Sequence, residues 1–142
     1  MLRKIGPEPG FTLLELMVVL LIVAVLASMA IPRFMQAAIK SKQSEAKMIL
    51  KQIYNMQQTY RQEFDSYWGD GVVATAAAPT AFARISVDIQ LPARYSYSMV
   101  AAANTFTCTA TSSILDDDPP PDIWVIDQTG NLQVTSDDVT LQ

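Results

Sequence analysis

Residues 11–31 read FTLLELMVVLLIVAVLASMAI, and this stretch decides the fold. Glu15 is its only charged residue, and Ser28 is the only polar side chain between Leu16 and Ile31. As a helix the stretch would be about 30 Å long, which matches the hydrocarbon thickness of a bilayer. It would be apolar on every side, which suits lipid or the centre of an assembly. A buried helix in a soluble protein is the alternative, but a chain of 142 residues has little other material to enclose it.

The composition argues against several classes of protein. The chain contains no histidine and one cysteine, which excludes His-based catalytic triads, His-ligated metals and intrachain disulfides. Its net charge of −4 gives no reason to expect nucleic-acid binding. We therefore expect a protein that is not an enzyme and that binds neither a cofactor nor nucleic acid.

A second helical signal follows the apolar stretch. Residues 33–64 hold six basic residues against two acidic ones, with no glycine or proline. Their apolar residues recur at spacings of three and four, which is typical of an amphipathic helix. The apolar stripe consists of Ala46, Ile49, Leu50, Ile53, Met56, Tyr60 and Phe64. Between the two segments, Pro32 is expected to kink or locally melt the helix; a helix end with a new start at Arg33 is the alternative.

The remaining residues, 65–142, hold ten Asp against two Arg and read as a small β domain. Gly69-Asp70-Gly71 supplies turn chemistry after the helix, and a short helix is expected near residues 79–83. Four later segments have strand length and are rich in aromatic and β-branched residues, namely 95–101, 105–111, 123–127 and 132–135. We predict an α+β fold in which an antiparallel sheet of three or four strands packs against the helical stripe.

The start of the chain resembles a known protein family. The segment GFTLLELMVV at residues 10–19, its apolar continuation and Ala30-Ile31-Pro32 are similar to the N-terminus of type IV pilins and type II secretion pseudopilins. The resemblance covers about residues 10–64 and is weaker in the strands. It implies a pilin-like α+β fold and a structural subunit of a type IV pilus-like filament. A type II secretion pseudopilin is the alternative within the family.

The resemblance also implies roles for four residues. Gly10 would end a leader that a prepilin peptidase removes, and Phe11 would become the N-methylated terminus. Glu15 would dock subunits, and Pro32 would loosen the helix. In physical terms, the Glu15 carboxylate can attract the Phe11 amine of a neighbouring subunit where water is excluded. The alternative for Glu15 is a side chain that reaches to the membrane interface.

The family pattern divides the chain into four parts: a leader (1–10), a transmembrane or filament-core helix (11–32), an amphipathic helix (33–64) and a C-terminal globular β domain (65–142). The precursor would lie in the inner membrane with its C-terminal domain outside, and the mature chain would form an extracellular or periplasmic filament. The expected partners are further copies in a helical homopolymer, the prepilin peptidase, and an inner-membrane assembly platform with its ATPase. Counting Lys and Arg at the two ends of the apolar stretch favours the opposite orientation. We follow the resemblance, because a dedicated leader and export route can override a modest charge bias.

A function of a different class also has a signal in the sequence. Arg3 and Lys4, the apolar stretch and Ser28-Met29-Ala30 fit a secretory signal peptide that is cleaved after Ala30. The mature protein would then be a secreted soluble binding domain. Glu15 counts against this interpretation, because a carboxylate at the start of the apolar region weakens insertion.

One acidic segment is a candidate for metal binding. Calcium prefers oxygen ligands, and the candidates are Asp116, Asp117, Asp118 and Asp122. Their spacing matches no calcium loop, so a solvated acidic loop is the favoured interpretation. Cys108 lies among threonines in a predicted strand and is expected to be buried rather than reactive.

Overall fold

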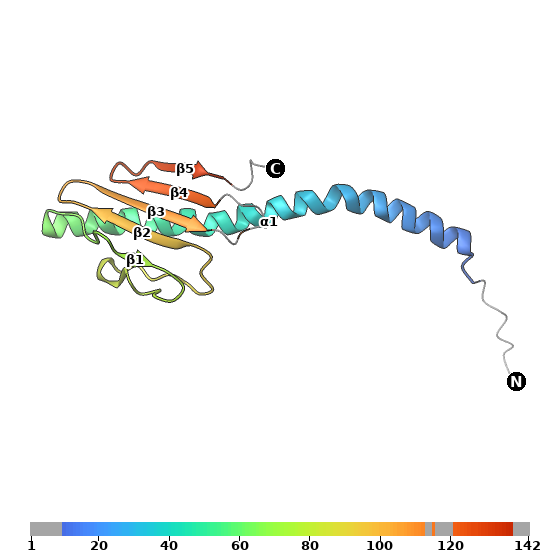
Figure 1. Ribbon diagram of the computed structural model, residues 1–142, viewed down its shortest axis with the longest axis horizontal. Helices are drawn as coiled ribbons and strands as arrows, with labels where there is room; N and C mark the ends of the chain where they lie inside the picture. The colour runs from blue at the N-terminus through green and yellow to red at the C-terminus, as the bar shows by residue number, and fades with distance from the viewer. Residues whose placement is uncertain (1–9, 113–114, 116–120, 138–142) are drawn as a thin grey trace, which may run out of the picture. The chain divides into compact units, whose positions relative to one another are not determined.

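The computed structural model describes residues 10–112, 115 and 121–137. The chain has an α+β fold, as predicted. In order along the chain, the elements are helix α1 (Leu13–Phe64), strand β1 (Val73–Ala74), the 3₁₀ helix η1 (Ala83–Ile85) and strands β2 (Ser96–Ala101), β3 (Phe106–Ser112), β4 (Asp122–Asp127) and β5 (Leu132–Ser136) (Figure 1). Of the predicted leader, only Gly10 lies within the described residues.

Helix α1 is 52 residues long and runs through Pro32 without interruption. The alternative of a helix end with a new start at Arg33 is therefore wrong, and the helix is not melted at the proline. The chain divides into two compact units, Met1–Gln36 and Ala37–Gln142, and α1 contributes residues to both. Whether Pro32 is a point at which the helix loosens stays a prediction.

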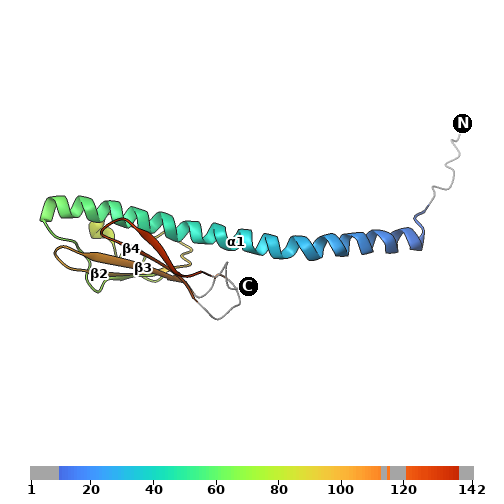
Figure 2. The same cartoon turned by 90° about the horizontal axis from the view of Figure 1, so that it is seen from above.

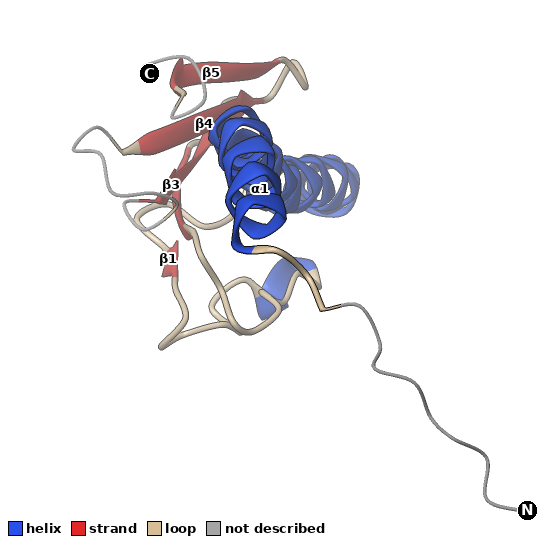
Figure 3. Ribbon diagram, turned by 90° about the vertical axis from the view of Figure 1, so that its right-hand side faces the viewer, coloured by secondary structure: helices blue, strands red, loops and turns tan. Residues whose placement is uncertain are grey.

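The second unit consists of two layers, a sheet and the part of α1 from residue 37 onward (Figure 2). All neighbouring strands are antiparallel and follow the chain in the order β1-β2-β3-β4-β5 (Figure 1), and Figure 3 shows β5, β4, β3 and β1 in this order across the sheet. The four strands predicted from sequence correspond to β2–β5 with small shifts at their ends. The prediction missed β1, a two-residue strand in which Val73 pairs with Ser98. The short helix expected at 79–83 is η1, which lies slightly later in the chain.

The core lies between these two layers. The helix contributes Ala46, Leu50 and Ile53, which are fully buried members of the predicted stripe. The sheet contributes alternate residues of its inner face, namely Tyr97, Met99, Phe106, Cys108, Ala110, Trp124 and Ile126. Farther along the stripe, Met56 and Tyr60 are only partly buried and Phe64 is exposed. Cys108 is buried as predicted, and desolvation raises the pKa of its thiol to about 12.

The β4–β5 turn is fixed by a hydrogen-bonded aspartate and a glycine. The hydroxyl and the amide of Thr129 both donate to the Asp127 carboxylate and hold its pKa below the ordinary value. Because the folded pKa is lowered, this turn contributes stability that is lost as the pH falls through that pKa. Gly130 follows with φ of 77°, and a Cβ placed there would lie 2.9 Å from the Tyr54 ring.

Gly130→Ala is therefore expected to destabilise the second unit by roughly 1–3 kcal/mol, from backbone strain together with the clash. Gly71→Ala is the matched control, because Gly71 also has a positive φ, 72°, but no atom lies within 4 Å of its Cβ position. Thermal unfolding followed by circular dichroism should show a larger loss for Gly130→Ala. Equal losses for the two variants would contradict the close approach of Tyr54.

Candidate functional site

The N-terminus of α1 is closed by three reciprocal hydrogen bonds between Thr12 and Glu15. The Thr12 backbone N–H and hydroxyl donate to Glu15 Oε2 at 2.9 and 2.8 Å, and the Glu15 N–H donates to the Thr12 hydroxyl at 3.2 Å. This arrangement is a capping box, in which two otherwise unpaired N–H groups at a helix start gain partners. Glu15 Oε1 has no protein partner among the described residues. That oxygen can accept a hydrogen bond from a further donor.

The sequence contains a signal for this cap in the spacing of Thr12 and Glu15. Thr12-Leu13-Leu14-Glu15, placed directly before an apolar run, has the [ST]-x-x-E spacing of a capping box. The sequence interpretation gives Glu15 a docking role, with an interfacial side chain as the alternative, and does not include the cap. The structure adds a local role for the same carboxylate, and any experiment on Glu15 has to separate the two roles.

The two residues before the cap are open to their surroundings. A Cβ built on Gly10 would meet no atom within 4 Å, and Phe11 is 86% exposed. The backbone around the Gly10–Phe11 bond is thus accessible, which is a requirement for cleavage by a peptidase.

The apolar stretch presents its side chains outward along its whole length. Helix α1 contains an 18-residue window with a mean hydropathy of 2.8, and none of that window is buried. By length and composition the helix could cross a membrane. A single chain leaves this surface uncovered in water, so it needs lipid or other protein around it.

Asp122 does not belong to a solvated acidic loop, and this part of the sequence interpretation is wrong. It begins β4 and is fully buried. Its Oδ1 accepts a hydrogen bond from Gln43 Nε2 at 2.9 Å, while Oδ2 accepts from the Tyr95 hydroxyl and, at 2.7 Å, from Trp124 Nε1. Gln43 Nε2 also donates to Asp137 at 2.8 Å. Both Asp122 oxygens are thus used: Oδ1 joins α1 to β4, and Oδ2 holds Tyr95 and Trp124 within the sheet layer.

The other calcium candidates, Asp116, Asp117 and Asp118, lie outside the described residues. Within the part of the chain that is described, no group of three or more acidic or thiol side chains could hold a metal ion. The buried position of Asp122 had no signal in the sequence, because its donors come from residues up to 79 positions away.

Comparison with known proteins finds two matches to the N-terminal part of the chain. Residues 8–31 match the family described as the prokaryotic N-terminal methylation motif. The type IV major pilin protein PilA of Myxococcus xanthus (strain DK1622) is 50% identical over 58 residues. The N-terminal part of this chain is therefore similar to a type IV pilin and carries the methylation motif. The matched residues make up 41% of this chain and 26% of that pilin, so the likeness to the pilin does not extend to most of either protein.

The match to the methylation motif contains Gly10, Phe11, Glu15 and the whole apolar stretch, and it ends one residue before Pro32. The methylation motif thus coincides with the surface that α1 leaves uncovered. The globular unit lies outside the motif, and its description rests on its own geometry.

Proposed function

We propose that the chain is a structural subunit of a type IV pilus-like filament, assembled by packing of its N-terminal helices. The observation that carries this proposal is the continuously exposed apolar helix within a prokaryotic methylation motif. Such a surface is stable in lipid and equally stable among copies of itself, because both surroundings supply apolar contacts. A precursor anchored in the inner membrane, with its C-terminal domain outside, can therefore pass into an extracellular or periplasmic filament.

Processing divides the chain into the parts expected from the family pattern. A prepilin peptidase cuts after Gly10 and releases the leader, and N-methylation then acts on Phe11. Residues 11–32 form the filament core, 33–64 the amphipathic helix and 65–142 the globular domain. The exposed backbone around Gly10 supports this route. An inner-membrane platform and its ATPase supply the work of extraction.

Glu15 supplies the contact that sets the register between subunits. Thr12 uses Oε2, which leaves Oε1 for the amine of Phe11 on a neighbouring copy. Docking thus satisfies two charges that would otherwise face an apolar core, and it is lost if either partner is removed.

Two observations favour this function over its alternatives. The relative is described as a major pilin, which favours a pilus over a secretion pseudopilus. Helix α1 also continues through Ala30 without a break, whereas release of a secreted binding domain would require cleavage within that helix.

The mass of the mature chain tests the proposal. We expect a chain that starts at Phe11 and carries one added methyl group. Gly10→Val is the matched variant: no atom lies near its Cβ position, so the fold is preserved while the added side chain blocks the peptidase. A native mature chain that begins at Ile31, or one that retains the leader, would contradict the proposal.

A further inference from the structure

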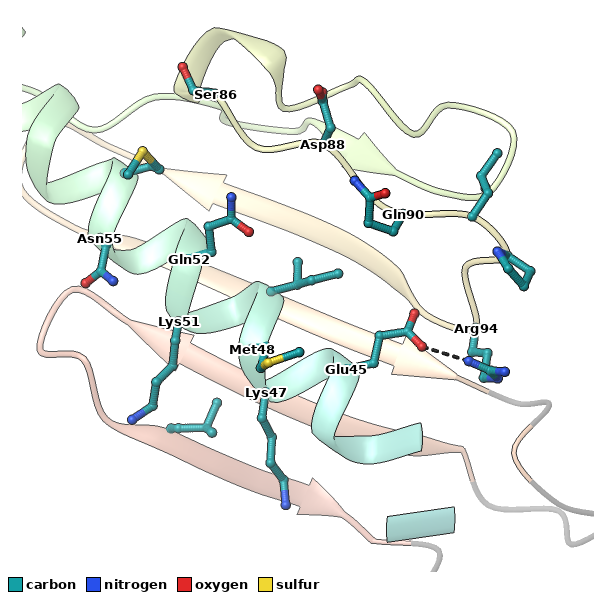
Figure 4. Close-up of a pocket in the computed structure, with 15 residues that line it drawn as sticks. Glu45, Lys47, Met48, Lys51, Gln52, Asn55, Ser86, Asp88, Gln90 and Arg94 are labelled. Atoms are coloured by element: carbon teal, nitrogen blue, oxygen red, sulfur yellow. Dashed lines mark hydrogen bonds and ion pairs between the residues drawn. The ribbon is translucent and has the colours of Figure 1, made fainter. Parts of the chain in front are cut away.

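A broad groove lies on the side of α1 that faces away from the sheet, within the second unit (Figure 4). One wall is the segment 86–94, and Leu132 of β5 also lines the groove. The groove volume is about 1240 Å³, larger than the roughly 300–1,000 Å³ of small-molecule sites. This size fits side chains from another protein segment better than a small ligand.

The floor of the groove is apolar and uncovered. Met48 is 71% exposed at its centre, and Leu91 is 61% exposed on the wall. Met56 and Pro92 extend the same apolar surface. Exposed methionine and leucine side chains that line one depression are typical of a surface that binds a partner.

Charged side chains of both signs line the groove, and Lys51 is one of them. Arg94 crosses from the wall to Glu45 on α1 in an ion pair of 2.9 Å, drawn as the dashed line in Figure 4. Lys47 lies 4.0 Å from the centre of the Trp124 ring, so it is already engaged with the sheet. Asp88 stands exposed on the rim, and no ionic partner for it exists among the described residues.

The first unit of the same chain carries the complementary features. Phe34 is 77% exposed and Met35 is 48% exposed. They follow Arg33, the first charge after the apolar stretch, and so lie beyond the uncharged run. Arg33 also lacks an ionic partner in the described part of the chain. One segment therefore combines a large apolar side chain with an adjacent cation, opposite in charge to Asp88.

We infer that the groove binds residues 33–35 of a second copy of the chain, with Phe34 over Met48 and Arg33 beside Asp88. This inference rests on the proposed function, because a filament supplies the second copy. The contact follows the helix-in-groove mode, in which a few apolar anchors supply affinity and rim charges fix the register. The two surfaces differ, so the contact is heterologous and repeats along a polymer instead of closing a dimer.

Cross-linking in assembled filaments tests the inference. Chains with Met35→Cys and differently tagged chains with Gln52→Cys are produced together, which leaves Phe34 and Met48 in place. A short bismaleimide should join the two tags in one product. Val100→Cys is the matched control for the groove position, because Val100 is 65% exposed on the outer face of the sheet. The native Cys108 is buried and does not react.

A charge exchange gives a second readout. Arg33→Glu should lower filament yield roughly fivefold, the effect of about 1 kcal/mol at a rim pair. Adding Asp88→Arg to that variant should restore most of the yield.

The outcomes separate the two proposals. If filaments form but Gln52→Cys cross-links no better than Val100→Cys, or the charge exchange does not rescue, the groove contact is wrong and the filament function stands. If the native chain forms no filaments under conditions in which a type IV pilin forms them, both proposals fail.

Discussion

Glu15→Ala is expected to abolish filaments while leaving membrane insertion intact. In the proposed docking, Oε1 of this carboxylate pairs with the Phe11 amine of a neighbouring copy, so the substitution would leave that amine unpaired in an apolar core. Removing one partner of a buried charge pair costs roughly 3–5 kcal/mol, and the loss recurs at every subunit. Loss of the cap adds about 1 kcal/mol or less at each helix start. Sheared surface material should contain no fibres by electron microscopy, while the membrane fraction retains the chain.

Glu15→Gln separates docking from capping. Glutamine is also found at this position of a capping box, so it can keep the hydrogen bonds to Thr12 while it removes the charge. If docking depends on the ion pair, this variant should lack filaments as completely as Glu15→Ala. Native filament yield in Glu15→Gln would show that the carboxylate acts only as a cap and would refute the docking role.

Asp122→Ala should be the most destabilising single change in the globular unit, with a loss of roughly 2–5 kcal/mol. It leaves the donors of Gln43, Tyr95 and Trp124 buried around an empty space. Because these donors come from α1, from the residue before β2 and from β4, the loss reaches both layers of the unit. The expected result is a large drop in the thermal midpoint of the full chain in detergent, followed by circular dichroism at sheet wavelengths.

Asp127→Asn is the control for that measurement. Asp127 is only partly buried, and an asparagine oxygen can still accept from Thr129. Its thermal midpoint should change little. If Asp122→Ala is no more harmful than Asp127→Asn, the buried network does not join the layers in the way described.

The elements that sequence predicts well are those with long periodic signals. The apolar run and the stripe of residues 46–64 each extend over several helical turns, so α1 could be placed to within two residues of its ends. Strands β2–β5 have alternating or β-branched patterns of ordinary length and were also found. Strand β1 has two residues and exists only because β2 offers it an edge, which no local pattern records.

The residues of the candidate site also differ in how well the sequence predicts them. Gly10, Phe11 and Glu15 could be singled out because their spacing is local and matches a family signature. Asp122 could not, since aspartate is usually exposed and its burial depends on Gln43, 79 positions earlier. The groove depends on a loop wall, residues 86–94, whose path is set by tertiary packing around buried Val87 and Ile89.

The hydrogen-bonded bridge from Gln43 to Asp122 and Asp137 has a consequence for how the globular unit matures. It holds the residue after β5 to the helix by hydrogen bonds, with no covalent link. The one thiol is sequestered and hard to ionise. Maturation of this unit therefore calls for no thiol oxidase, and dithiothreitol should leave its melting curve unchanged.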